Sequence, residues 1–170
     1  MKIFETSRTI LREVTTDDAE FILDLLNQPS FIRYIGDRNV RTIGEAREYI
    51  ESRFMESYRK LGFGMWAVES KETSEPIGIC GFVKRDGLPD ADIGFAFLPQ
   101  FEKKGYAFES AAAALEYGKS TLKITCVLAI TSKDNDSSGK LLGKLDFKFD
   151  RLILLPGGSE ELNLFSYHAT

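Results

Sequence analysis

The alanine-rich run around residue 112 constrains the fold more than any other feature of this sequence. Alanines stand at positions 107 and 111–114 between Gly105 and Tyr117, and they combine strong helix propensity with a thin surface. The run follows the strand-like segment DIGFAFLP and precedes the continuous apolar run ITCVLAIT. A β-branched run of that kind suits a strand that is covered on both faces. The sequence therefore predicts a slim helix that packs closely against a sheet.

Two helices are expected before this region, and both begin with a capping signal. Thr15 stands three residues before Asp18, and apolar residues then recur with the spacing of one buried helical stripe. Pro29 is expected to end this helix. Thr42 repeats the signal with a glutamate three residues later, and the longer helix that follows should close at Gly62.

The strand signals follow one another without an interrupting repeat or linker. RTILREV is typical of a strand, and MWAVES, IGICGFVK and ADIGFAFLP, which polar turns separate, favour an antiparallel meander. A short helix with Leu141, Leu142 and Leu145 should follow ITCVLAIT. FKFDRLILL and ELNLFSY then flank PGGS as a final hairpin. The order of these elements predicts a mixed α/β sheet in one domain.

The composition excludes several classes of protein. The chain has 22 basic and 26 acidic side chains, a net charge of −4, and no basic stripe, so nucleic acid is a poor partner and an amine ligand is compatible. Two cysteines, Cys80 and Cys126, and one histidine, His168, argue against a disulfide framework and against a metal site. No apolar run reaches the roughly 18 residues of a membrane span, and the polar start lacks a signal peptide, so we expect a cytoplasmic protein.

The junction between DIGFAFLP and the alanine-rich helix is the place where chemistry is expected. A helix N-terminus leaves about four backbone N–H groups without partners and carries a partial positive charge, which favours an anion. Gly105 permits close approach of the backbone, and Lys103 and Lys104 add two full charges. These features favour a phosphate or pyrophosphate, although one glycine makes neither of the two common nucleotide-binding patterns. A plain helix start is the alternative.

The same junction, FLPQFEKKGYAFESAAAALEYG, resembles the acetyl-CoA motif of the GNAT superfamily of N-acetyltransferases, whose core is Q/R-x-x-G-x-G/A at a helix start. The resemblance covers nearly the whole chain. TSRTILREVTTDDAEFILDLL is similar to the opening of the ribosomal-protein N-terminal acetyltransferase branch, GMWAVES and EPIGICGF to its central strands, and NDSSGKLLGKLDF to its N-x-x-S-x-x-L-x-x-K-x-G-F segment. The resemblance implies one α/β domain over residues 1–170, with a mixed, mostly antiparallel sheet between helices and acetyl-CoA as co-substrate.

The resemblance also implies which residues bind the cofactor. Gly105 and Ala107 fill the last two fixed places of the motif, whereas Glu102 stands where the family has Gln or Arg. The strand backbone is expected to pair with the pantetheine amides, as an added strand does. The residues assigned to the cofactor in this way are Phe97, Leu98, Lys103, Lys104, Gly105, Tyr106, Ala107, Phe108 and Asn135.

The catalytic groups are less complete than the cofactor motif. Many members of the superfamily protonate the departing thiolate with a tyrosine, but the matching position here is Leu142. The ribosomal branch implies Ser138 as the proton donor, and a serine that only caps the helix start is the alternative. Asp92 is the candidate general base, or else a solvated aspartate at a strand start. The later acidic position of the branch falls closest to Glu160 and Glu161.

The acceptor is expected to be a primary amine, because the family transfers acetyl groups to amines. The resemblance places Tyr34, Asp37 and Arg38 beside the acceptor cleft. An α-amine with a pKa near ~7.8 is roughly 14% neutral at pH 7, against about 0.04% for a lysine amine, so weak base machinery favours a protein or peptide N-terminus. The alternatives are a small amine, such as a polyamine or an aminoglycoside, and a catalytically silent module that binds CoA. A homodimer is one expectation for the assembly.

Overall fold

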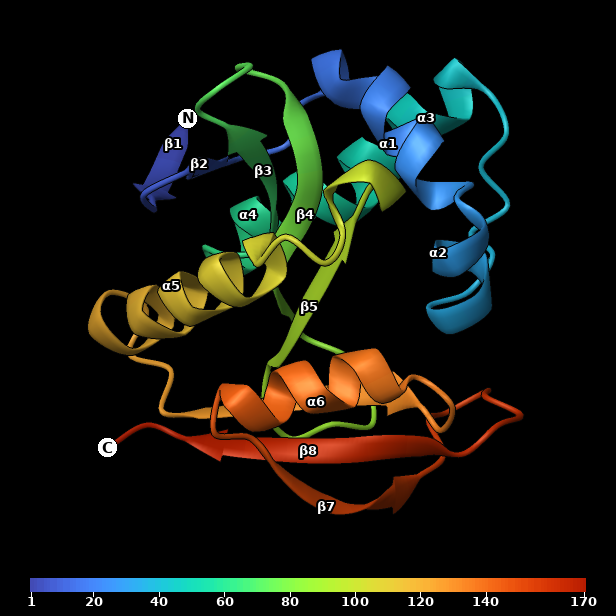
Figure 1. The fold of residues 1–170 in the computed structure, drawn as a ribbon. Helices are drawn as coiled ribbons and strands as arrows, with labels where there is room; N and C mark the ends of the chain where they lie inside the picture. The colour runs from blue at the N-terminus through green and yellow to red at the C-terminus, as the bar shows by residue number, and fades with distance from the viewer.

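Eight strands form one sheet in the order β1-β2-β3-β4-β5-β6-β8-β7. The computed structural model describes residues 1–170, and Figure 1 shows helices on both faces of the sheet. Every neighbouring pair of strands is antiparallel except β5 and β6, which confirms a mixed, mostly antiparallel sheet. The strands are β1 (Lys2–Glu5), β2 (Thr9–Arg12), β3 (Met65–Ser70), β4 (Pro76–Val83), β5 (Asp92–Phe97), β6 (Cys126–Ser132), β7 (Lys148–Ile153) and β8 (Leu162–His168).

The strands and helices follow the expected order, with two elements that were not predicted, the strand β1 and the helix α2. Pro29 follows the end of α1 and also begins α2. In the first turn of a helix the N–H that proline lacks would have no partner, so its absence costs nothing. The helices are α1 (Ala19–Leu26), α2 (Pro29–Tyr34), α3 (Ile43–Tyr49), α4 (Glu56–Leu61), α5 (Tyr106–Ser120) and α6 (Asp136–Lys144). A π-helical segment, Ile50–Met55, joins α3 to α4.

The caps of the first helices decide where these elements begin and end. Thr15 and Asp18 form the predicted capping box. The Thr42 hydroxyl accepts from the Glu45 N–H at 3.1 Å, but the Glu45 carboxylate accepts from the Thr42 hydroxyl and from the N–H of residue 41 instead of closing a box. Gly62 ends α4 in the left-handed region, at φ 77°.

Two hydrophobic cores lie on opposite faces of the sheet. Alternate residues of β3 divide between them: Trp66 and Val68 pack with α5 and α6, and Ala67 packs with α1, α3 and the π-helical segment. In Figure 1, α5 and α6 lie in front of the sheet and α4 lies behind β4. None of the helices combines the length and the apolar character that crossing a membrane would require.

The helix α5 lies close to the sheet, as its alanines predicted. Ala111 and Ala114 are fully buried. A Cβ on Gly118 would lie 2.9 Å from the Phe82 ring, so a larger side chain at this position would push the helix away from β4. The small residues of α5 therefore set the distance at which its N-terminus meets the end of β5.

Candidate active site

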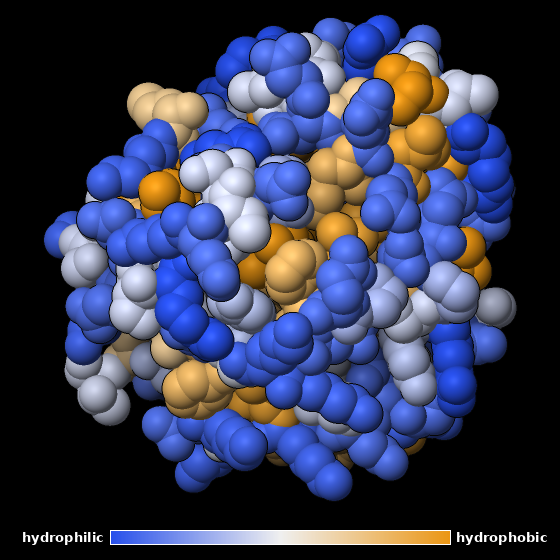
Figure 2. Space-filling view, turned by 45° about the horizontal axis from the view of Figure 1, so that its top comes forward, coloured by the Kyte–Doolittle hydropathy of each residue, from blue (hydrophilic) through white to orange (hydrophobic).

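The strands β5 and β6 separate almost as soon as they meet. They are paired in parallel at one position, Asp92 with Leu128, and the rest of β5 has no partner on this side. A cleft of about 1530 Å³ opens between them, lined by 45 residues of which 24 are hydrophobic. Figure 2 shows apolar side chains in the middle of one face, surrounded by hydrophilic ones. Three large apolar side chains that line the cleft, Ile35, Leu61 and Phe108, are exposed.

The cleft is reached from both faces of the sheet. Its lining includes residues of α6 and of the loop before α5, which pack on one face, and residues of α2, α4 and the π-helical segment, which pack on the other. Two molecules can therefore enter from opposite sides and meet where the strands separate. That arrangement suits a transfer between two substrates, because both reacting groups are held at once.

Six consecutive backbone N–H groups, from Lys103 to Phe108, donate to no acceptor within the chain. The first backbone bond of α5 runs from the Glu109 N–H to the Gly105 carbonyl at 3.0 Å. Lys103 and Gly105 both have positive φ, 60° and 85°, and turns of this kind point successive N–H groups to one side. We call residues 103–108 the anion cradle. Such a row of N–H groups is suited to a phosphate or pyrophosphate.

Six of the nine residues predicted to bind the cofactor line the cleft, and three do not. Glu102, where the family motif has Gln or Arg, also lines the cleft and is exposed. Three predicted residues, Leu98, Lys104 and Tyr106, are absent from the lining, although the N–H groups of Lys104 and Tyr106 belong to the cradle. The predicted cofactor residues that line the cleft are Phe97, Lys103, Gly105, Ala107, Phe108 and Asn135.

Leu98 does not fit its predicted role. Its N–H donates to the Ile77 carbonyl at 3.0 Å and its carbonyl accepts from the Phe101 N–H at 2.9 Å, so neither group is free for pantetheine. Backbone groups along a strand point alternately to its two sides. Phe95 and Phe97 therefore direct theirs toward the open edge of β5.

The start of α6 brings two of the predicted residues together, Asn135 and Ser138. The Asn135 side chain caps the helix, accepting from the Ser138 N–H at 3.2 Å. The Ser138 hydroxyl has no hydrogen-bond partner within the chain, and Ser138 lines the cleft. Leu142 lines the cleft too, where it is almost fully buried. The local capping bond that could have explained Ser138 is thus made by Asn135 instead.

Asp92 is buried at the closed end of the gap between β5 and β6. Its side chain is 1% exposed, and both carboxylate oxygens accept from Arg85 Nε at 3.1 Å. Burial raises the pKa of Asp92 above its ordinary value, against the lowering effect of the Arg85 charge. It is therefore not the solvated strand-start aspartate of the alternative interpretation.

The predicted acceptor residues are only partly brought together. Tyr34 and Arg38 line the cleft. Asp37 does not, because its carboxylate accepts from Arg41 at 2.6 Å and from the Asn39 N–H at 2.8 Å. The pKa of Asp37 is lowered by the Arg41 hydrogen bond, as expected for a carboxylate held in an ion pair.

The charge of the cleft is opposite to the charge of the chain. Three acidic residues line it, Glu56, Asp92 and Glu102, and the first two are paired with Lys60 and Arg85. Clefts of one sign concentrate ligands of the other. The basic residues of the lining are Arg38, Arg53, Lys60, Lys84, Arg85, Lys103, Lys140 and Lys144.

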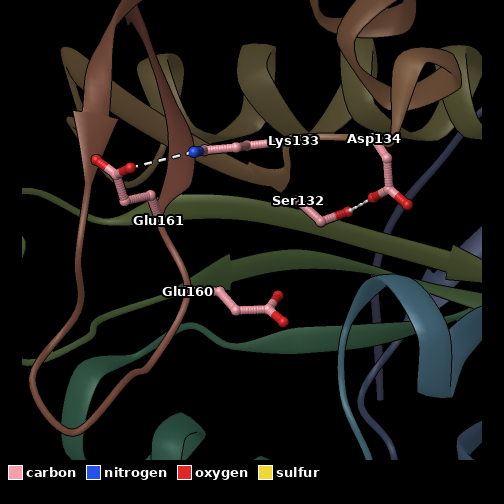
Figure 3. A pocket seen from close by; sticks show the side chains of 5 residues that line it. All are labelled: Ser132, Lys133, Asp134, Glu160 and Glu161. Atoms are coloured by element: carbon pink, nitrogen blue, oxygen red, sulfur yellow. Dashed lines mark hydrogen bonds and ion pairs between the residues drawn. The ribbon is translucent and has the colours of Figure 1, made fainter.

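A smaller polar pocket adjoins the cleft and shares Ser132 with it (Figure 3). Glu161 pairs with Lys133 at 3.1 Å, whereas Glu160 has no ion partner. Glu160 and Glu161, the carboxylates nearest in sequence to the acidic position of the ribosomal branch, therefore lie beside the cleft and not in it. No group of three or more His, Cys, Asp or Glu side chains comes together here or elsewhere as a metal site would require.

Two residues at this site, Arg8 and Arg53, were not predicted from the sequence. Arg8 contacts the anion cradle from the turn between β1 and β2, more than ninety positions away in the sequence. Arg53 lines the cleft from the π-helical segment and has no carboxylate partner. Neither carries a local pattern, because each reaches the site only through the packing of its element.

Comparison with known proteins agrees with this geometry. Residues 8–148 match the acetyltransferase (GNAT) domain family. The uncharacterized N-acetyltransferase YoaA of Bacillus subtilis (strain 168) is 33% identical over 152 residues, which cover 89% of this chain and 85% of YoaA. RimL, a ribosomal-protein alpha-N-acetyltransferase solved in complex with coenzyme A, superposes with a TM-score of 0.85 at 16% identity, over 99% of this chain and 98% of RimL.

A spermidine N-acetyltransferase has the same fold. The SpeG chimera from Vibrio cholerae and hSSAT superposes with a TM-score of 0.77 at 16% identity, over 95% of this chain and 96% of the chimera. Enzymes that act on ribosomal proteins and on a small amine thus share this architecture, and the fold alone does not select the acceptor. The family match over most of the chain shows the activity class: this chain belongs to the GNAT family of acetyl-CoA-dependent N-acetyltransferases.

Proposed function

We propose that this enzyme transfers the acetyl group of acetyl-CoA to the N-terminal α-amine of a protein or peptide. The observation that carries the proposal is the cleft between β5 and β6, which joins the anion cradle on one face of the sheet to an acceptor end on the other. The acceptor end is lined by α2, α4 and the π-helical segment, and every carboxylate there is paired with a cation.

The chain's own groups account for binding the cofactor. The anion cradle would hold the pyrophosphate, with Lys103 adding a full charge beside it. The backbone groups of Phe95 and Phe97 at the open edge of β5 would pair with the pantetheine amides, as in strand addition. The thioester then lies where β5 and β6 separate, between the two faces.

Transfer requires that a nitrogen–carbon bond forms as the carbon–sulfur bond breaks, while the nitrogen loses a proton and the sulfur gains one. The free hydroxyl of Ser138 is our candidate to donate the proton to sulfur. The N-terminus of α6, where Ser138 lies, also favours the negative charge of the departing thiolate.

The acceptor end favours an α-amine over a polyamine. A polyamine carries several positive charges, whereas Arg38 and Arg53 line this end without carboxylate partners. Glu160, in the adjoining pocket, is one nearby carboxylate without an ion partner, and it cannot balance several charges. An α-amine needs little help from a base, because roughly 14% of it is neutral at pH 7. The unpaired arginines further favour acidic side chains behind the terminal amine.

A panel of acceptors tests this proposal. We expect acetylation of peptides whose terminal amine is followed by acidic residues, and at least tenfold lower kcat/KM for spermidine and for an aminoglycoside, measured by mass spectrometry and thiol release.

Arg53→Glu should raise the KM for the acidic peptide about fivefold and leave the KM for acetyl-CoA unchanged. Arg47→Glu, on the exposed surface of α3 and outside the cleft, is the matched control. Exclusive acetylation of small amines would contradict the proposal.

Asp92 is our candidate to accept the amine proton, and its raised pKa suits that role because a base works best near the operating pH. The base must be ionised, so kcat should fall on the acid side, at a pH above about 4, the ordinary pKa of aspartate. Asp92→Asn should remove this fall of kcat on the acid side of the pH profile, and it should lower kcat about tenfold to a hundredfold at neutral pH. Asp90→Asn, outside the cleft lining, is the control. An unchanged pH profile would show that Asp92 only pairs with Arg85.

A catalytically silent module that binds CoA is the second candidate, favoured by Leu142 at the position of the usual tyrosine and by Glu102 in the cofactor motif. It predicts tight binding of CoA together with no thiol release on any amine of the panel. Turnover on one acceptor excludes it.

A further inference from the structure

We propose that Arg8 binds the pyrophosphate of coenzyme A through its free Nη2 group, and that it also holds the loop of the anion cradle in place. Arg8 stands in the turn between β1 and β2, and neither the cofactor motif nor the cleft lining includes it. The inference rests on the proposed cofactor site, and it adds a side-chain donor to a cradle otherwise built from backbone groups.

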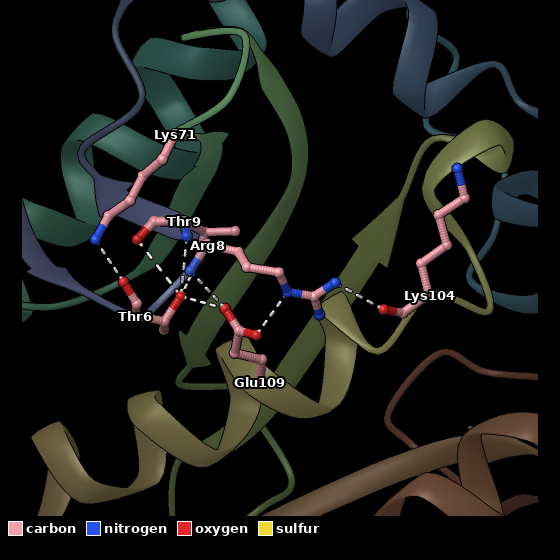
Figure 4. A network of polar contacts seen from close by, with 6 residues as sticks. All are labelled: Thr6, Arg8, Thr9, Lys71, Lys104 and Glu109. Atoms are coloured by element: carbon pink, nitrogen blue, oxygen red, sulfur yellow. Dashed lines mark hydrogen bonds and ion pairs between the residues drawn. The ribbon is translucent and has the colours of Figure 1, made fainter.

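Glu109, in the first turn of α5, holds the Arg8 side chain in one orientation (Figure 4). Arg8 Nε donates to Glu109 Oε1 at 2.9 Å, and the Arg8 backbone N–H donates to Oε2 at 3.1 Å. The Thr6 hydroxyl donates to the same Oε2. Burial alone would raise the pKa of Glu109, but these hydrogen bonds outweigh it and lower the pKa, so the carboxylate stays charged at neutral pH.

The turn that carries Arg8 is itself fixed. The Thr6 and Thr9 hydroxyls lie 2.6 Å apart, and Lys71 Nζ donates to the Thr6 carbonyl at 2.6 Å (Figure 4). Arg8 therefore approaches α5 from an ordered turn, and little side-chain entropy remains to be lost when an anion binds.

The other side of the guanidinium holds the loop of the cradle. Arg8 Nη1 donates to the Lys104 carbonyl at 3.0 Å, and the guanidinium carbon lies 4.1 Å from the centre of the Tyr106 ring. A carbonyl oxygen carries partial negative charge and would repel a phosphate if it faced the cradle. The bond from Arg8 keeps this oxygen engaged and leaves the six N–H groups of the loop for the ligand.

The third nitrogen of the guanidinium is free and close to the cradle. Arg8 Nη2 makes no hydrogen bond within the chain, and it lies 3.2 Å from the place where a Cβ on Gly105 would stand. Arg8 is 42% exposed, so this nitrogen is open to a ligand. The planar guanidinium thus uses two nitrogens to fix its own position and keeps one for an anion, which the single ammonium of a lysine does not do.

Calorimetric titration with coenzyme A and with dephospho-CoA, which keeps the pyrophosphate and lacks the 3′-phosphate, tests this inference. Arg8→Gln should weaken the binding of both ligands by the same factor, about tenfold to a hundredfold. Arg8→Lys should recover only part of the loss. Arg151→Gln is the matched control, because it removes an exposed arginine that is paired with Asp150 on the edge strand β7, and it should change neither affinity more than twofold.

Glu109→Gln provides a second route, because it loosens Arg8 without removing the guanidinium, and it should weaken both ligands severalfold. A role limited to binding the pyrophosphate also predicts that kcat at saturating acetyl-CoA is kept, and that kcat/KM with acetyl-pantetheine, which lacks all phosphates, is unchanged. A purely structural role would lower both.

Three results would overturn the inference. Affinities within threefold of the wild type for Arg8→Gln would show that Arg8 contributes nothing to binding. A loss confined to coenzyme A would place Arg8 at the 3′-phosphate instead of the pyrophosphate. A wild-type protein that binds neither ligand would overturn the cofactor site itself, and the inference with it.

Discussion

Gly105→Asp should abolish the binding of coenzyme A, with a loss of affinity of at least a hundredfold. Gly105 caps α5 at φ 85°, and a Cβ there would stand 3.2 Å from Arg8 Nη2. The new carboxylate would therefore lie inside the anion cradle, pair with Arg8 and occupy the place of a phosphate. Thermal shift with coenzyme A measures the effect, because a ligand that binds only the folded state raises Tm. We expect no shift in this variant.

Gly157→Asp is the matched control for this substitution. Gly157 has a similar φ of 77° with no atom within 4 Å of an added Cβ, and it lies outside the cleft lining. The control introduces the same charge and the same backbone cost, so it separates strain from occupation of the cradle. A normal thermal shift in Gly105→Asp would mean that the cofactor binds elsewhere.

Ser138→Ala should lower kcat about a hundredfold while the KM for acetyl-CoA stays within twofold, because the hydroxyl is needed only as the thiolate leaves. The fold should be unaffected, since Asn135 makes the capping bond of α6 through the Ser138 backbone and not its hydroxyl. Steady-state kinetics at saturating acetyl-CoA, with a peptide acceptor found in the panel, measures both constants.

Ser137→Ala is the control for Ser138→Ala. Ser137 is the preceding residue of the same helix turn and also lines the cleft, so its loss reports a general effect of removing a hydroxyl there. Equal rates for Ser138→Ala and the wild type would assign the proton to another donor, such as solvent.

The net charge of the chain was a poor guide to the ligand. A total of −4 made an amine or cationic ligand compatible, yet most of the charged residues that line the cleft are lysines and arginines. Charges act over about 8 Å at physiological salt, so the local arrangement and not the total decides what a cleft attracts. That arrangement depends on elements distant in sequence, such as α4, α6 and the π-helical segment, which only packing brings together.

Local sequence patterns found some of the site residues, and only the tertiary packing could find others. Gly105 and Ala107 line the cleft, and the sequence could point to them because the motif is local to one helix N-terminus. The Leu98 N–H is bonded to β4 and does not face the cleft, because strand parity depends on which neighbour takes each N–H. Arg8 was not found at all, because its partners Lys104 and Glu109 lie about one hundred positions away.

The sequence by itself determined the order of the strands and helices other than β1 and α2, together with the thin α5 and the N–H-rich turn before it. Apolar spacing, capping residues and glycine act through neighbours along the chain. Only the tertiary structure decided where β5 and β6 separate, that the cleft is reached from both faces, and which side chains meet in it. The physical reason is that a gap between strands is a property of two packed faces, which no single segment encodes.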